Sequence, residues 1–212
     1  MIKQLVFDVD GTLIDDGDYP STVKRILERN DLEPEKYYDS YVYATQTYED
    51  HYSNYNEKDY LIYLSKCMQV KLKEEFINVM FEEISHMIPS NNKKIRNTLK
   101  KLSKRYDLVI LSNYFSKAQM MRLKNMGVDL YFKEIYGQDV IKDNPKAYQL
   151  ACGKYKPEEC VMIGDNPIKD IKGAKKYGMH TIYINKKGEN IQDVSTIDAV
   201  KNITIDFIEN IK

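Results

Sequence analysis

The feature that most constrains the fold is a series of short apolar runs, rich in valine and isoleucine, separated by longer amphipathic stretches. The clearest runs are 5–9 (LVFDV), 107–113 (DLVILSN), 160–165 (CVMIGD) and 180–185 (HTIYIN). Strands that alternate with helices along a chain are typical of a parallel α/β sheet. The sequence therefore predicts an α/β protein.

The stretches between these runs carry helix start and stop signals. A helix is predicted over 93–105, and another from Ser116, a residue suited to an N-cap, to Gly127. The helical stretch 171–179 is expected to stop at Gly178. We also expect short strands at 134–137 and 198–203 and a closing helix over 204–212.

The region from 16 to 88 breaks the alternation of strands and helices. It has helical periodicity, as in 23–30 and 74–88, and contains no convincing strand. The α/β pattern resumes at Pro89. We therefore predict an α/β core domain formed by 1–15 and 89–212, and an inserted all-helical domain formed by 16–88.

Charge and cysteine usage argue against several classes of protein. The 212 residues include 32 Lys+Arg and 32 Asp+Glu, so the formal net charge is zero. No excess of positive charge is present that would attract nucleic acid or a membrane surface. The three cysteines form no C-x-x-C pair and do not cluster with the histidines, which fits reduced thiols rather than a zinc site. No apolar run reaches membrane length. We expect a cytoplasmic protein without nucleic-acid, membrane or obligate protein partners.

Polar residues gather where the predicted strands end. The carboxyl ends of parallel strands face one crevice, which is the usual ligand site of an open α/β sheet. Four separate segments are therefore expected to converge there. Their polar residues are Asp8 and Asp10, Ser112 and Asn113, Lys142, and Asp165 with Asp170.

Several carboxylates in one crevice point to a bound cation. Without one, they would repel each other and raise one another's pKa. Oxygen ligands without histidine or cysteine favour Mg²⁺, which also binds substrate phosphate. The carboxylates thus predict both a magnesium ion and a phosphorylated substrate, with a carboxylate beside the metal as the nucleophile.

These residues resemble a known family. The segments 8–13 (DVDGTL), 112–113 (SN), Lys142 and 164–170 (GDNPIKD) are similar, in this order, to the four motifs of the haloacid dehalogenase superfamily of phosphotransferases. The resemblance covers about 1–15 and 89–190. It implies a Rossmann-like core with a C1-type helical cap, as in the phosphatase-like members of subfamily I.

The resemblance also implies roles for the acidic residues. Asp8 would be the nucleophile that becomes an aspartyl phosphate, and Asp10 the general acid and base. Mg²⁺ would be held by Asp8, by Asp165 and by Asp10 through its backbone carbonyl. Dehalogenases of the superfamily lack an aspartate at position 10, because a halide leaves without a proton, so Asp10 favours a phosphatase.

Phosphate binding would fall to residues from three of the motifs. Ser112 and Asn113 would hold phosphate oxygens together with nearby loop amides and the following helix N-terminus. Lys142 would neutralise the phosphate and Asp8. Gly11, which lets the backbone turn tightly, and Thr12 would complete the site.

Two assignments stay open in the sequence. Motif spacing favours Lys142 as the active-site lysine, but Lys146 lies in the same loop and competes with it. Asp170 could be a metal ligand or could orient Lys142. It could also be only a carboxylate near a helix terminus, where the helix macrodipole favours a negative charge.

The segment 37–63 holds nine of the eighteen tyrosines. These could line the substrate site, because tyrosine offers an apolar body and a polar tip. Packing within the helical domain is the favoured interpretation, since aromatic residues at helical spacing usually form a core. His51 is expected to be a surface or packing residue.

The predicted function is a magnesium-dependent phosphatase acting on a small phosphorylated metabolite, such as a sugar phosphate, phosphoglycolate or a nucleoside monophosphate. The segment 110–132 looks like the corresponding part of capped nucleotidases in the family, which leans the prediction toward nucleotides. The alternatives are a phosphomutase, in which Asp8 passes its phosphoryl group to a sugar, and a non-catalytic sensor of a phosphorylated ligand.

Overall fold

A computed structural model describes residues 1–14, 18–186, 188 and 194–211 of the chain. Its centre is a six-stranded sheet in the order β3-β2-β1-β4-β5-β6, and every pairing is parallel. The strands are β1 (Gln4–Phe7), β2 (Asp107–Leu111), β3 (Phe132–Tyr136), β4 (Cys160–Gly164), β5 (His180–Ile184) and β6 (Ser195–Ile197). The predicted α/β class with a Rossmann-like core is thereby confirmed.

The strand order places the ligand crevice. The chain winds outward in one direction from β1 and in the other from β4, and such a switch point opens a crevice at the carboxyl ends of the two strands. Phe7, the last residue of β1, lies opposite Ile110 and Ile163. The residues that follow β1, β2 and β4 therefore emerge together at one edge of the sheet.

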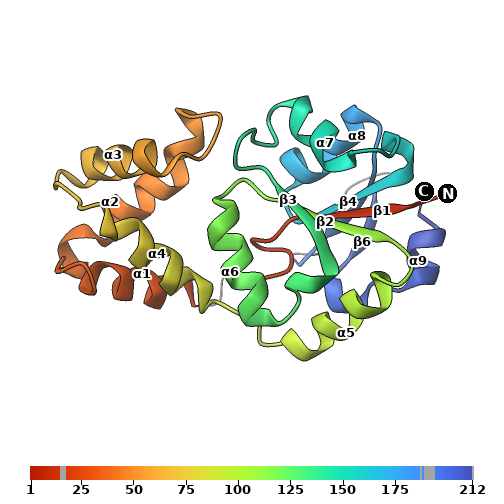
Figure 1. Cartoon of the computed structure of the whole chain (residues 1–212), viewed down its shortest axis with the longest axis horizontal. Coiled ribbons are helices and arrows are strands. Elements are labelled where there is room, and N and C mark those ends of the chain that lie inside the picture. Colours follow the sequence, from red (N-terminus) through yellow and green to blue (C-terminus); the bar gives the residue numbers. More distant parts are fainter. Residues whose placement is uncertain (15–17, 187, 189–193, 212) are drawn as a thin grey trace.

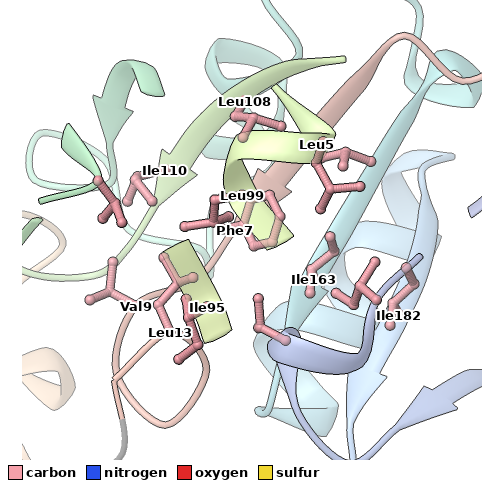
Figure 2. Packing of buried hydrophobic residues seen from close by; sticks show 14 of the residues in the cluster. Leu5, Phe7, Val9, Leu13, Ile95, Leu99, Leu108, Ile110, Ile163 and Ile182 are labelled. Carbon is pink, nitrogen blue, oxygen red and sulfur yellow. The ribbon is translucent and has the colours of Figure 1, made fainter. Parts of the chain in front are cut away.

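Helices cover both faces of the sheet (Figure 1). On one face, α5 (Asn92–Leu102), α6 (Ser116–Met126) and α9 (Ile205–Glu209) pack on Leu5 and Phe7, as Figure 2 shows for α5. On the other face, α7 (Pro145–Cys152) and α8 (Ala174–Tyr177) pack on Val6. Side chains from β1 alternate between the two faces, and burying each contributes roughly 1.5–3 kcal/mol.

Four further helices form a group to one side of the sheet (Figure 1). This four-helix unit consists of α1 (Tyr19–Glu28), α2 (Pro34–Thr47), α3 (Glu57–Met68) and α4 (Glu75–Ser85). It has its own apolar cluster, which continues onto Phe115 and Ala118 at the start of α6. Residues 15–17, where the predicted domain boundary falls, lie outside the described residues, and the division at 16 and 88 stays a prediction.

Several expected elements differ from the structure in detail. Residues 198–203 were predicted as a strand, which is wrong: the last strand is 195–197, and Val200–Asn202 is a 3₁₀ turn. That turn buries Val200 in the sheet cluster, and Asn202 Nδ2 donates to Asp198 Oδ1 at 2.7 Å. Ser116 is the first residue of α6 rather than its N-cap, which is Phe115.

Other expectations are confirmed. Gly127 and Gly178 end α6 and α8 in the left-handed conformation, and the strand predicted at 134–137 is present as β3, which spans Phe132–Tyr136. The helix predicted over 171–179 begins earlier, as the π-helix Pro167–Gly173 that continues into α8. Within the part of the chain that the structure describes, no helix combines the length and apolar character needed to cross a membrane.

An ion-pair cluster holds α1 against α4 and gives a stability prediction. Glu83 is almost buried and accepts hydrogen bonds from Arg25 Nε at 2.8 Å and Arg29 Nη1 at 2.7 Å. Glu83→Gln should lower the free energy of unfolding by roughly 1–3 kcal/mol, because bonds between charged groups at a poorly hydrated position are lost. Denaturant unfolding measures this.

The matched control is Glu82→Gln. Arg29 Nη2 also donates to Glu82, but this pair is about half exposed on both sides. Exposed pairs contribute about 0–1 kcal/mol, so this variant should unfold nearly as the wild type does. Equal losses for the two variants would show that burial of Glu83 is not what makes its contacts strong.

Candidate active site

A buried lysine lies between two carboxylates at the carboxyl end of β1. Asp8 directly follows the strand, and its backbone N–H donates to Ile163 O at 2.9 Å. Lys142 Nζ donates to Asp8 Oδ1 at 2.6 Å and to Asp170 Oδ1 at 2.7 Å. All three side chains are at most 8% exposed, so the charges are held in a poorly hydrated centre.

The pKa values in this centre follow from burial and from the mutual charges. Burial raises the pKa of Asp8 well above its usual value, and the nearby ammonium of Lys142 only partly offsets this. Burial opposes the charge of Lys142 as well, but Asp170 and Asp8 outweigh it and raise its pKa. Lys142 is therefore a permanent cation directed at Asp8.

The structure separates the two candidate lysines. Lys142 is buried against Asp8, whereas Lys146 is exposed in the first turn of α7, where its backbone N–H donates to Asn144 Oδ1 at 2.9 Å. Asp170 contacts Lys142 and also accepts the backbone N–H of Asn166 at 2.9 Å. Asp170 thus contacts both the lysine and the loop after β4.

The side chain of Asp10 is directed toward α6. Asp10 Oδ2 accepts a hydrogen bond from Gln119 Nε2 at 2.8 Å, and Oδ1 accepts one from Arg122 Nη1. Gln119 Nε2 also donates to Ser112 Oγ at 2.9 Å. Loss of hydration would raise the pKa of Asp10, but Arg122 and Gln119 outweigh that effect and lower it.

Two glycines allow the loops to approach each other closely. A Cβ atom on Gly11, whose φ is +76°, would lie 2.2 Å from Asp165 Oδ2, and one on Gly164 would lie 2.2 Å from Asp170 Oδ2. Thr12 Oγ1 donates to Asp165 Oδ1 at 3.2 Å. The loop after β1 therefore packs directly on the loop after β4, with Thr12 turned toward Asp165.

Three carboxylates could hold a metal ion. One oxygen each from Asp8, Asp165 and Asp170 lie within 4.8 Å of one another. When ionised, three carboxylates and the one ammonium of Lys142 leave two uncompensated negative charges, which matches a divalent cation. Burial, followed by the charge of Asp170, raises the pKa of Asp165. The residues fit Mg²⁺, which prefers carboxylate oxygens.

The crevice that holds these groups has a volume of about 180 Å³, and Asp10, Ser112 and Asn113 also line it. A second cavity of about 340 Å³ adjoins it, because Asp10 borders both. Five of the eleven described residues that line it are tyrosines: Tyr19, Tyr41, Tyr55, Tyr60 and Tyr114. A larger hollow of about 690 Å³ lies by Lys3 and Asp107 at the amino ends of β1 and β2, away from these carboxylates.

The tyrosine-rich segment both packs and lines the cavity. Tyr48 is fully buried and stacks on Tyr52 with ring centres 4.5 Å apart, as the packing interpretation predicts. Tyr41 and Tyr60 are also buried, yet they border the cavity. His51 is exposed, with its ring 5.3 Å from that of Tyr63, and it lines neither space.

Comparison with known proteins identifies the family. The model of the haloacid dehalogenase-like hydrolases matches residues 5–184. The chain belongs to this family. The glyceraldehyde 3-phosphate phosphatase of Methanothermobacter thermautotrophicus is 24% identical to it over 96% of this chain and 98% of that protein. The glyceraldehyde 3-phosphate phosphatase of Pyrococcus furiosus is 25% identical to it over 86% of this chain and 80% of that protein.

Solved structures of the family share the fold. The HAD-hydrolase YfnB from Bacillus subtilis, solved with magnesium, has a TM-score of 0.69 at 18% identity and covers 93% of this chain and 95% of its own. The 2-haloacid dehalogenase of Pseudomonas syringae has a TM-score of 0.71 at 19% identity and covers 95% and 96%. At this identity the likeness concerns the fold alone.

Four side chains at the site were missed by sequence reasoning. Gln119 and Arg122 are buried polar residues three apart on α6, a signal that could have been read from their place among the apolar positions of that helix. Glu49 and Lys169 also line the crevice. Glu49 comes from the tyrosine-rich segment 37–63 and Lys169 from the predicted motif 164–170. No sequence pattern indicates that these two residues lie in contact.

Proposed function

We propose that the protein is a magnesium-dependent phosphatase that hydrolyses a small phosphorylated metabolite through an aspartyl phosphate on Asp8. The observation that carries the proposal is the buried contact of Lys142 with Asp8, at 2.6 Å, beside Asp165 and Asp170. A carboxylate fixed by a cation beside a site fit for Mg²⁺ is suited to attack a phosphoryl group.

In the first step, a carboxylate oxygen of Asp8 attacks phosphorus and the bond to the ester oxygen breaks. Asp10 gives a proton to the departing oxygen, which requires that it be protonated in the substrate complex against the charge of Arg122, which lowers its pKa. In the second step, Asp10 takes a proton from the water that attacks the aspartyl phosphate, which releases inorganic phosphate and restores Asp8. General acid–base transfer of this kind contributes about 10²–10⁴ in rate.

The remaining residues bind and orient the phosphoryl group. Lys142 offsets its charge together with that of Asp8, and Ser112 and Asn113 line the same crevice. Thr12 and the backbone at Gly11 do not line it but pack against Asp165, which does. When bound, Mg²⁺ would be held by Asp8, Asp165 and the backbone carbonyl of Asp10, while Asp170 would stay bonded to Lys142 and to the backbone of Asn166. The ion would supply positive charge to the phosphoryl oxygens.

The tyrosine-lined cavity is suited to bind the leaving group of a small substrate. It adjoins Asp10, the proposed proton donor, and its rings can stack on a flat or cyclic group while their hydroxyls hydrogen-bond to it. A nucleoside monophosphate or a sugar phosphate meets this description. The four-helix unit, which supplies most of these tyrosines, would act as the cap that excludes water during phosphoryl transfer.

Phosphate release from a panel of phosphorylated metabolites tests the proposal. The panel should contain nucleoside monophosphates, sugar phosphates including glyceraldehyde 3-phosphate, phosphoglycolate and phosphoserine. We expect release from one of the first two classes, loss of activity in EDTA and recovery in excess Mg²⁺. Indifference to chelation would exclude the metal, and an isomerised sugar phosphate without net release would identify a phosphomutase instead.

A further inference from the structure

Glu49 brings a carboxylate from the four-helix unit into the crevice that holds Asp8 and Lys142. It lies in the short turn Tyr48–Asp50 between α2 and α3. Among the described residues that line the crevice, it alone belongs to the four-helix unit, and the others follow β1, β2, β3 and β4. Its side chain is 19% exposed, so it is largely withdrawn from solvent.

Three donors hold this carboxylate. Asn113 Nδ2 donates to Glu49 Oε2 at 2.9 Å, and Lys169 Nζ donates to the same oxygen at 2.5 Å. Tyr55, which belongs to the same unit, donates its hydroxyl to Oε1 at 2.8 Å. Two donors from the α/β core thus meet one carboxylate oxygen that comes from across the crevice.

Asn113 Nδ2 and Lys169 Nζ can each donate a further hydrogen bond to a second acceptor. An asparagine amide nitrogen carries two hydrogens and a lysine ammonium three, so each has at least one left after bonding Glu49. Asn113 is fixed from its other end as well, because its Oδ1 accepts the backbone N–H of Lys142 at 2.8 Å. Glu49 therefore sets the direction in which Asn113 and Lys169 present their remaining hydrogens.

The position of Glu49 depends on docking of the four-helix unit. Tyr55 N donates to Gln138 O at 2.7 Å, and Ile141 N donates to Ser53 O at 3.3 Å, so the loop after Glu49 is bonded to the loop that leads to Lys142. The neighbouring Tyr48 ring is buried among other tyrosines. These bonds and this packing hold the turn that carries Glu49 against the α/β core.

We propose that Glu49 is a positioning residue that completes the phosphate site when the four-helix unit docks. Its carboxylate aims Asn113 and Lys169 at the phosphoryl group, and the charge of Lys169 offsets the repulsion that a carboxylate would otherwise exert there. The inference rests on the proposed phosphatase function. It adds that the four-helix unit organises phosphate binding in addition to covering the leaving group.

The test uses four full-length variants: Glu49→Gln, Lys169→Gln, the double variant, and Asp50→Asn as the matched control. Asp50 is the exposed neighbour of Glu49 in the same turn. Calorimetry with Mg²⁺ measures the Kd of inorganic phosphate, and p-nitrophenyl phosphate measures kcat and KM. Denaturant unfolding checks that Glu49→Gln, which is nearly isosteric, folds like the wild type.

We expect Glu49→Gln to weaken phosphate binding and to lower kcat/KM by about tenfold each, because a charged acceptor that orients two donors is lost. The double variant should be no worse than Lys169→Gln alone, since both changes break one arrangement. Asp50→Asn should match the wild type.

Three outcomes would overturn the inference. Tighter phosphate binding in Glu49→Gln would mean that the carboxylate competes with phosphate for the same donors. Unchanged binding would mean that it does not orient them, and losses that multiply in the double variant would mean that the two residues act separately. If the wild type binds phosphate but turns nothing over, the phosphatase proposal fails, and the binding constants still decide the role of Glu49.

Discussion

Replacing Asp8 with asparagine should abolish phosphate release, with kcat lowered by about 10⁴-fold or more, because the attacking oxygen becomes an amide that cannot form the covalent intermediate. The fold should remain stable. Burial raises the pKa of Asp8, so ionising this group in the folded protein costs free energy that a neutral side chain avoids. Steady-state phosphate release and denaturant unfolding, both compared with the wild type, measure the two effects.

Asparagine can still accept the hydrogen bond from Lys142, which keeps its second partner Asp170. A variant that unfolds early would therefore show that the charge of Asp8 is needed for stability, and its low activity would not then report on chemistry. Wild-type activity in a folded Asp8→Asn variant would remove the aspartyl phosphate from the mechanism.

Replacing Lys142 with methionine should lower kcat by about 10²–10³-fold, which is the usual loss when one preorganised charge at a reacting group is removed. It should also destabilise the fold by roughly 3–5 kcal/mol, because Asp8 and Asp170 would be left buried without their shared cation. Phosphate release and denaturant unfolding measure the two losses, and bound Mg²⁺ should reduce the second.

Lys146→Met is the matched control. This lysine lies in the same loop and carries the same charge, but its side chain is exposed. Its loss should leave activity and stability close to wild type. A large loss in Lys146→Met, with a small one in Lys142→Met, would mean that the lysine buried beside Asp8 is not the one that acts on the phosphoryl group.

The part of the site that follows strands could be predicted from sequence. Parallel strands place their carboxyl ends together whatever the loops contain, so Asp8, Ser112 and Asp165 were expected at one crevice before any contact was known. Lys142 was favoured by motif spacing over Lys146, which lies in the same loop. The fold class was predictable for the same reason, because short buried runs alternate with helices.

The part that depends on helix packing could not be predicted. Periodicity shows which face of α6 is buried, but not that Arg122 and Gln119 on that face meet Asp10. Glu49 reaches Asn113 only because the four-helix unit docks against the core, and no local pattern encodes that contact. The wrong strand at 198–203 has a similar cause, since Val200 is buried by a turn rather than by a strand.

The most direct test of the central claim is to trap the covalent intermediate on Asp8. The wild-type enzyme would be mixed with Mg²⁺ and p-nitrophenyl phosphate, quenched rapidly in acid, digested and examined by mass spectrometry. The account predicts one phosphoryl group on the peptide that contains Asp8, labile to hydroxylamine and absent from Asp8→Asn. Steady release of phosphate with no label on Asp8, or with the label on another residue, would contradict it.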